Sequence, residues 1–174
     1  GNDSMRAADF QTVLDDDSVK AIICARGGYG TVRIVDGLDF SKFKKTPKWV
    51  VGYSDITVLH SHISGNLGIQ TIHGTMPINF ETNTELALES LRKTLFGERL
   101  TYEIPAHQFN RKGTREGELT GGNLSILYSL IGSPSDIDTT GKILFIEDLD
   151  EYLYHIDRMM QNLKRSGKLS NLAG

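Results

Sequence analysis

One cysteine, Cys24, is present among the 174 residues of the sequence. A single thiol excludes an intrachain disulfide and a zinc site made of several cysteines, and it favours a reducing compartment. Long apolar runs are missing too, because stretches such as residues 21–25 fall far short of the about 20 residues that cross a bilayer as a helix. The 19 Lys and Arg residues are scattered and the formal net charge is −3, so no basic surface for nucleic acid is indicated. We therefore expect a soluble chain that binds neither nucleic acid nor membrane.

The remaining composition is that of a folded protein. Apolar residues make up 39% of the chain and charged residues 24%, enough to bury a core in one substantial domain or two small ones. Short β-branched runs predict three strands, and patterns of helical spacing separate them. The three strands lie at residues 19–25, 49–51 and 69–72. Such alternation is typical of an α/β fold with a parallel sheet and crossover helices, whose site lies in the loops at the carboxyl ends of the strands. These loops are residues 26–30, 52–55 and 73–77.

The character of the sequence changes after residue 96. Residues 97–116 indicate a linker, with room for an edge strand. A second unit, residues 117–174, is predicted to contain a helix that opens at Gly121-Gly122-Asn123, a strand that ends before Glu147, and an amphipathic helix. We therefore expect an N-terminal α/β unit at residues 1–96, a linker, and the start of a second α/β unit.

The first of the three loops contains Gly27-Gly28-Tyr29-Gly30. Glycines after a strand let backbone N–H groups approach an anion, because no Cβ blocks the approach and a helix amino terminus follows. The order of the glycines is not that of a dinucleotide-binding fingerprint, and no acidic residue is placed to hold a ribose. The loop is therefore either a tight turn or a backbone cradle for a developing negative charge.

The second loop places Ser54 directly after a buried strand and before a helix, in Gly52-Tyr53-Ser54-Asp55. On such a strand-to-helix turn a serine hydroxyl stands at the sheet edge, where the N–H of the next residue can donate to an oxyanion. Ser and Asp are also preferred N-cap residues, so Ser54 or Asp55 can instead be a helix cap. The second glycine of the lipase-type motif is absent, and the pattern leaves both interpretations open.

Glu147 is the first of several acidic residues that follow the strand predicted in the second unit. Such residues are usually solvated, but a carboxylate at this edge can also orient a histidine by accepting from its ring N–H. Among the five histidines, His73 follows a strand at the edge where it can face the Ser54 loop. No two histidines have the spacing of a convincing ligand pair on one helix face, so a metal site is not expected.

Four motifs together resemble the LD-carboxypeptidases, serine peptidases that trim murein tetrapeptides and that have the microcin-immunity hydrolases as close relatives. The motifs are Ala25-Arg26-Gly27-Gly28-Tyr29-Gly30, Gly52-Tyr53-Ser54-Asp55-Ile56-Thr57, Gly121-Gly122-Asn123-Leu124-Ser125 and Leu144-Phe145-Ile146-Glu147-Asp148. They occur in the order of the family and at similar separations across nearly the whole chain. The resemblance implies an N-terminal α/β domain that carries the serine and a C-terminal domain that carries the acidic residue, with the site between them.

The resemblance also implies a role for individual residues. Ser54 is then the nucleophile, and Glu147 is the acidic member of a Ser-His-Glu triad. The N–H of Asp55 and a glycine N–H from Gly27 or Gly28 form the oxyanion hole.

Substrate binding requires a further group, because the terminal carboxylate of a peptide needs a cation. Arg26 or Arg158 would supply that cation, and Tyr29 lies beside Arg26 in the same loop. The implied reaction is release of the terminal D-alanine from murein tetrapeptide during peptidoglycan recycling, in the bacterial cytoplasm and without a metal or organic cofactor.

Two departures from the family pattern concern the ends of the chain. The catalytic histidine of the family follows the acidic residue by a long stretch in a Gly-His setting, and none of the five histidines here occupies that position. The family also has an additional strand and helix before the segment that corresponds to residues 1–14. We therefore expect an internal fragment with both domains partial, inactive by itself, and we expect its open sheet edge to favour aggregation or a homodimer.

Two other functions stay open. A microcin-immunity hydrolase would cleave an acyl-adenylate-like amide with the same triad. A non-catalytic module would bind a small anion at the glycine loop, and its binding would not depend on Ser54.

Overall fold

The computed structural model describes residues 1–174 as an α/β structure with two parallel sheets. The first sheet has the strand order β1-β2-β3, and the second pairs β4 with β5. The strands are β1 (Ala21–Ile23), β2 (Trp49–Gly52), β3 (Ile72–His73), β4 (Leu119–Asn123) and β5 (Ile143–Glu147). Every pairing is parallel, so the fold class expected from the sequence is confirmed.

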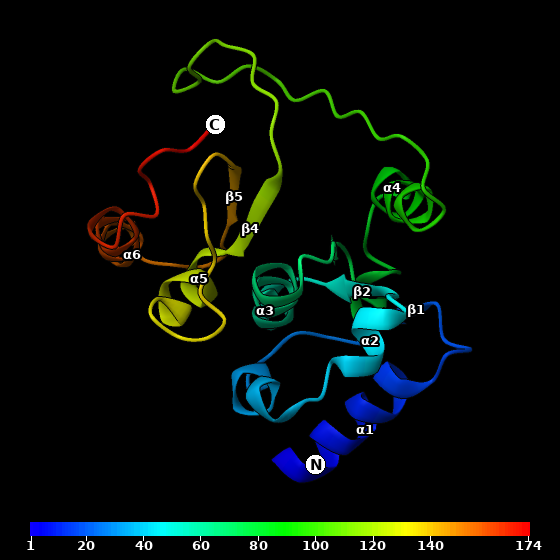
Figure 1. The fold of residues 1–174 in the computed structure, drawn as a ribbon. Helices are drawn as coiled ribbons and strands as arrows, with labels where there is room; N and C mark the ends of the chain where they lie inside the picture. The colour runs from blue at the N-terminus through cyan, green and yellow to red at the C-terminus, as the bar shows by residue number, and fades with distance from the viewer.

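Six α-helices cover or connect the sheets (Figure 1). They are α1 (Asp3–Asp15), α2 (Ser41–Lys45), α3 (Thr57–Leu67), α4 (Glu85–Leu95), α5 (Leu124–Leu130) and α6 (Leu153–Arg165). Side-chain caps begin three of them, because Asn2, Thr84 and Asn123 each accept a hydrogen bond from a backbone N–H in the first turn. No helix of the structure has the length and apolar character needed to cross a membrane.

Four details of the predicted elements were wrong. The segment at Gly121 and Gly122 is part of β4, not the start of a helix; both glycines have strongly positive φ values, a backbone that strand propensity does not predict. The helical pattern after Ser54 predicts a stop at Gly65, but α3 continues to Leu67, and Gly68, with a φ of 65°, is its left-handed C-cap. The pattern of residues 31–38 predicts one helix, but these residues contain two 3₁₀ turns. The edge strand for which residues 97–116 have room is not formed.

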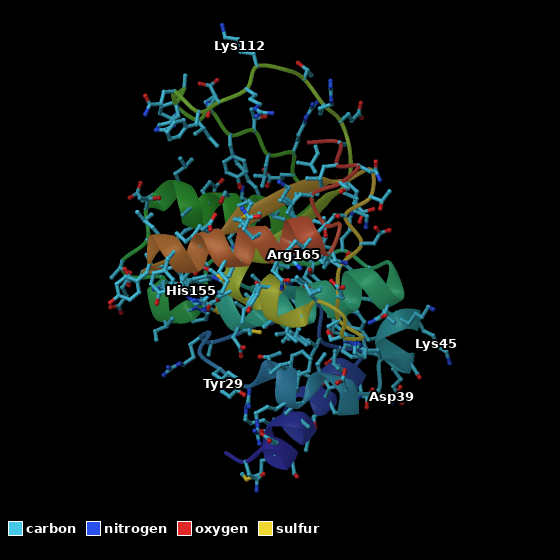
Figure 2. The ribbon with its side chains drawn as sticks, turned by 90° about the vertical axis from the view of Figure 1, so that its left-hand side faces the viewer. Tyr29, Asp39, Lys45, Lys112, His155 and Arg165 are labelled. Carbon is cyan, nitrogen blue, oxygen red and sulfur yellow. The ribbon has the colours of Figure 1, made fainter.

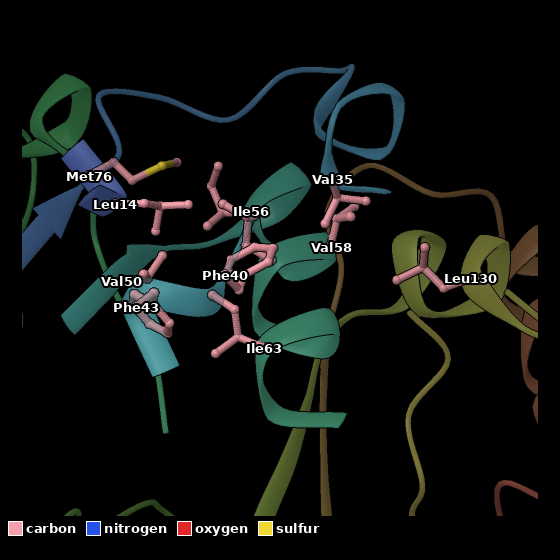
Figure 3. Close-up of a cluster of buried hydrophobic side chains, with 11 residues drawn as sticks. Leu14, Val35, Phe40, Phe43, Val50, Ile56, Val58, Ile63, Met76 and Leu130 are labelled. Carbon is pink, nitrogen blue, oxygen red and sulfur yellow. The ribbon is translucent and has the colours of Figure 1, made fainter. Parts of the chain in front are cut away.

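The main hydrophobic core lies between the first sheet and the helices around α3 (Figure 3). Its eleven buried side chains come mostly from residues before 77, but Leu130 of α5 belongs to the same cluster. Figure 1 shows α3 between the first sheet and the pair α5 and β4. Both units therefore bury apolar surface against α3, which positions the two sheets relative to each other.

A polar contact adds to this packing at the N-terminus of α3. The N–H of Asn123 in β4 donates to Thr57 Oγ1 over 3.1 Å, and both residues are buried. The neighbouring Gly122 leaves room for the approach, because a Cβ there would lie 2.7 Å from the Thr57 side chain. By contrast, residues 98–118 form an exposed excursion between α4 and β4, with Lys112 near its outer tip (Figure 2).

Candidate active site

Ser54 lies on the turn between β2 and α3, as the sequence predicts. Its φ is +60°, a left-handed conformation that is uncommon for a residue with a Cβ. The preceding strand is paired on both sides, since Val51 aligns with Ile23 and with Ile72, and the 3₁₀ turn Ser54–Ile56 leads directly into α3. A strained residue between a fixed strand and a helix is the arrangement that presents a nucleophilic serine in many hydrolases.

The helix-cap interpretation of this turn is wrong. The residue before the 3₁₀ turn is Tyr53 and the residue before α3 is Ile56, and neither position has a side-chain cap. The carboxylate of Asp55 is buried and bonds Thr31 instead. The Ser54 side chain is not used to begin either helical element, which leaves its hydroxyl free for chemistry.

The glycine loop after β1 lies directly against Ser54. A Cβ at Gly27 would be 3.0 Å from Ser54 Cβ and 3.1 Å from Ser54 Oγ, closer than ordinary van der Waals contact. The next residue, Gly28, has a φ of 122°, which residues with a side chain rarely adopt. The glycines therefore bring backbone, rather than side chains, next to the serine hydroxyl.

Glu147 ends β5 at the corresponding edge of the second sheet, opposite Asn123. Its carboxylate is partly buried, and burial raises the pKa of Glu147 above its ordinary value. The Oε1 atom is buried and has no hydrogen-bond partner in the chain. Glu147 is therefore not a freely solvated surface acid, because one of its two carboxylate oxygens is buried without a partner.

His73 lies between the Ser54 turn of the first sheet and Glu147 of the second sheet. It ends β3, where it pairs with Gly52, and its Nε2 lies 3.9 Å from Glu147 Oε1 in the other sheet. Its ring centroid is 6.2 Å from that of Tyr53, the residue before Ser54, and burial lowers the pKa of His73. The expectation that His73 can face the Ser54 loop agrees with this position, and the geometry adds Glu147 as its nearest acidic group.

Comparison with known proteins identifies the family. A model of the LD-carboxypeptidase N-terminal domain matches residues 1–74, and a model of the LD-carboxypeptidase C-terminal domain matches residues 116–174. The chain belongs to the LD-carboxypeptidase family.

Curated relatives of this LD-carboxypeptidase chain match all or nearly all of it. A probable murein peptide carboxypeptidase of Bacillus subtilis is 47% identical over 100% of the chain and 56% of the relative. A murein tetrapeptide carboxypeptidase of Pseudomonas aeruginosa is 31% identical over 95% of the chain and 57% of the relative. The chain thus spans a little more than half the length of these relatives.

Solved structures agree with the assignment to the LD-carboxypeptidases. A muramoyltetrapeptide carboxypeptidase from Oxalobacter formigenes superposes with a TM-score of 0.86 at 31% identity, over 99% of this chain and 59% of the other. The microcin C7 self-immunity protein MccF superposes with a TM-score of 0.85 at 25% identity, over 99% of this chain and 61% of the other. Both branches of the family expected from the sequence therefore share this fold.

Two arginines of the LD-carboxypeptidase chain are candidates for binding the terminal carboxylate of a peptide, and they lie on different elements. Arg26 is exposed on the glycine loop, next to Gly28, and Tyr29 of that loop is 77% exposed. Arg158 lies on α6, with its guanidinium 5.5 Å from the centroid of the Tyr154 ring. Only Arg26 and Tyr29 thus share a loop with the glycines that contact Ser54. The structure contains no group of three or more His, Cys, Asp or Glu side chains arranged to hold a metal ion.

Two residues around the site were given no functional role from the sequence. Thr31 follows the glycine loop and bonds the Asp55 side chain. The Asn123 side chain caps α5 and donates to Asp148, which places it beside Glu147. A threonine at the end of a glycine loop and an asparagine before a helix are common, so the sequence offers no signal beyond the capping preference of asparagine.

His60 supports the strand that carries the nucleophile candidate, and it predicts a pH dependence of stability. It is buried in α3, its Nε2 donates to the Gly52 carbonyl over 2.9 Å, and burial lowers its pKa to about 4. Because the unfolded chain binds the proton more readily, this contribution to stability is present above pH 6.5 and is lost as the pH falls toward 4. The loss amounts to about 3 kcal/mol of unfolding free energy.

Urea unfolding at pH 7 and pH 4 tests this prediction. His60→Gln keeps an N–H donor but removes the titration, so its decrease in unfolding free energy between these pH values is expected to be smaller than that of the unmodified chain by about 3 kcal/mol. His107→Gln, at an exposed position, is the matched control and should behave like the unmodified chain. Equal decreases in the His60 variant and the unmodified chain would contradict the prediction.

Proposed function

We propose that this chain carries the nucleophile of a serine carboxypeptidase that releases the terminal D-alanine of murein tetrapeptide during peptidoglycan recycling. The observation that carries the proposal is the left-handed Ser54 with Gly27 against its hydroxyl. The two relatives, a probable murein peptide carboxypeptidase and a murein tetrapeptide carboxypeptidase, supply the substrate class. Both the substrate and the activity are proposed for a protein of the relatives' length that contains this chain.

The proposed reaction begins with attack of Ser54 Oγ on the carbonyl carbon of the bond before D-alanine. The serine proton passes to a histidine, which later protonates the leaving amine. Glu147 accepts a hydrogen bond from that histidine, which keeps the ring in the required tautomer and stabilises its protonated form. The buried Oε1 of Glu147, which accepts no hydrogen bond within this chain, supports this role.

The base itself is proposed to lie outside residues 1–174. The family resemblance associates it with a Gly-His setting that none of the chain's five histidines occupies. His73, the histidine near Glu147, is the last residue of β3 in the first sheet. The 174-residue chain by itself is therefore expected to show only residual turnover.

The oxyanion is proposed to bind backbone donors. The proposed donors are the N–H of Asp55, the residue after Ser54, and the N–H of Gly27 or Gly28 in the loop against Ser54. Each such donor contributes roughly 3 kcal/mol to stabilisation of the transition state in serine hydrolases. Arg26, with Tyr29 beside it, is proposed to bind the terminal carboxylate of the substrate, because both belong to the loop that contacts Ser54. We place the reaction in the bacterial cytoplasm, and a homodimer remains an expectation for the assembly.

Labelling with a serine-reactive phosphonate tests the nucleophile. In a protein of the relatives' length that contains this sequence, mass spectrometry should locate one phosphonate on Ser54. The label should be absent from the Ser54→Ala variant, while Ser129→Ala, on the exposed face of α5, should be labelled as the unmodified protein is. Labelling that persists in Ser54→Ala, or none in any variant, would contradict the proposal and favour a non-catalytic anion-binding module.

The structural likeness to MccF favours a second candidate, hydrolysis of an acyl-adenylate-like amide by the same groups. One solved structure of MccF is a complex with aspartyl sulfamoyl adenosine. The only tryptophan here, Trp49, is half-buried in β2 against Val51, Ile72 and Leu91, so it offers no exposed platform for a base. Parallel assays with murein tetrapeptide and an aminoacyl sulfamoyl adenosine would distinguish the two, and we expect the murein peptide to be preferred.

A further inference from the structure

The Asp55 side chain has a specific partner on the other side of the site. Its Oδ2 accepts two hydrogen bonds from Thr31, one from the backbone N–H over 3.0 Å and one from the hydroxyl over 2.7 Å. Asp55 is 4% exposed and Thr31 is 5% exposed, so water does not compete for these bonds. Bonds to a buried carboxylate are among the stronger ones in proteins. The contact joins residues that are far apart in the sequence.

Thr31 marks the end of the glycine loop. It directly follows Gly30, which has a φ of 117°, and it begins the first 3₁₀ turn. The other end of the loop is held independently, because the N–H of Cys24 donates to the Val51 carbonyl over 3.0 Å. At the second end, Arg6 of α1 also donates to the Gly30 carbonyl over 3.2 Å, but only the bonds from Thr31 to Asp55 join this end to the turn that carries Ser54.

Asp55 is also the residue whose N–H is the proposed partner of the glycine N–H in the oxyanion hole. We propose that the Asp55 carboxylate is a positioning group that sets the separation between these two donors by holding Thr31. The inference rests on the proposed function for its catalytic consequence. Donors must lie about 2.7–3.1 Å from the developing oxyanion. A misplacement of about 1 Å can lower a rate by about 100-fold.

Thr31→Val provides the first test, because it keeps the shape and the backbone N–H but removes the hydroxyl donor. Amide hydrogen exchange in this 174-residue chain should be at least about tenfold faster at position 31 in the variant. The amide of Cys24, at the other end of the same loop, is the internal control and should exchange as before. Thr31→Ser retains both donors and should restore slow exchange.

Kinetics supply the second test, in a protein of the relatives' length that hydrolyses murein tetrapeptide. Thr31→Val should lower kcat by about 10- to 100-fold with KM changed less than about twofold, since displaced donors act on the transition state. Thr31→Ser should retain kcat within about threefold, which a general loss of packing would not explain.

Three results would overturn the inference. The first is amide exchange at position 31 that is unchanged in Thr31→Val. The second is an acceleration of exchange at Cys24 in Thr31→Val as large as that at position 31. The third is a kcat of Thr31→Ser as low as that of Thr31→Val. Failure of the proposed function has a different signature, namely an unmodified protein that neither turns over murein peptide nor reacts with a phosphonate. In that case the exchange experiment still decides whether Asp55 positions the loop.

Discussion

Ser54→Ala is expected to lower kcat for release of D-alanine from murein tetrapeptide by about 10⁴-fold or more, with KM changed less than about twofold. Without the hydroxyl no acyl-enzyme forms, and only the oxyanion donors and substrate binding still accelerate direct attack by water. The alanine Cβ occupies the space of the serine Cβ beside Gly27, so the loop geometry is retained.

The measurement is steady-state release of D-alanine by a protein of the relatives' length that contains this sequence. Ser129→Ala is the matched control, since it removes a hydroxyl that bonds only the Ile126 carbonyl on the surface of α5. Its kcat should equal that of the unmodified protein. A Ser54→Ala variant that keeps more than about one hundredth of the kcat would contradict a nucleophilic role.

Gly121→Ala is expected to destabilise the second sheet by about 4 kcal/mol or more, a loss found only for severe steric or electrostatic faults. Gly121 has a φ of 130°, and a Cβ there would lie 1.8 Å from the Phe145 carbonyl oxygen of the paired strand. Neither atom can move without breaking the pairing of β4 with β5. Since Glu147 depends on that register for its place, the variant should lose function together with stability.

Urea unfolding compares this variant with Gly132→Ala. Gly132 also has a positive φ, 81°, but a Cβ there would meet nothing within 4 Å. Its substitution should therefore cost only the backbone strain, about 1–2 kcal/mol. Similar losses in the two variants would show that the contact with Phe145 is not the cause.

Local sequence patterns predicted most of the elements that carry the site. The turn at Ser54 was predicted because an apolar strand, a glycine and a helical pattern follow one another in a short span. The same reasoning failed at β4, because Gly121 and Gly122 lie in a strand although two adjacent glycines are typical of turns. The boundary of the linker and the roles of Arg26 and Tyr29 stay predictions.

The sequence by itself determined the strand-to-helix turn, the glycine loop and the family, because these depend on residues adjacent in the chain and on motif order. Only the tertiary structure decided that Asp55 bonds Thr31 and that Glu147 lies 3.9 Å from His73. These contacts join residues that are 24 and 74 positions apart, the second across two sheets. Which residues meet in these contacts depends on how α3 packs between the sheets, and a local sequence pattern does not predict that packing.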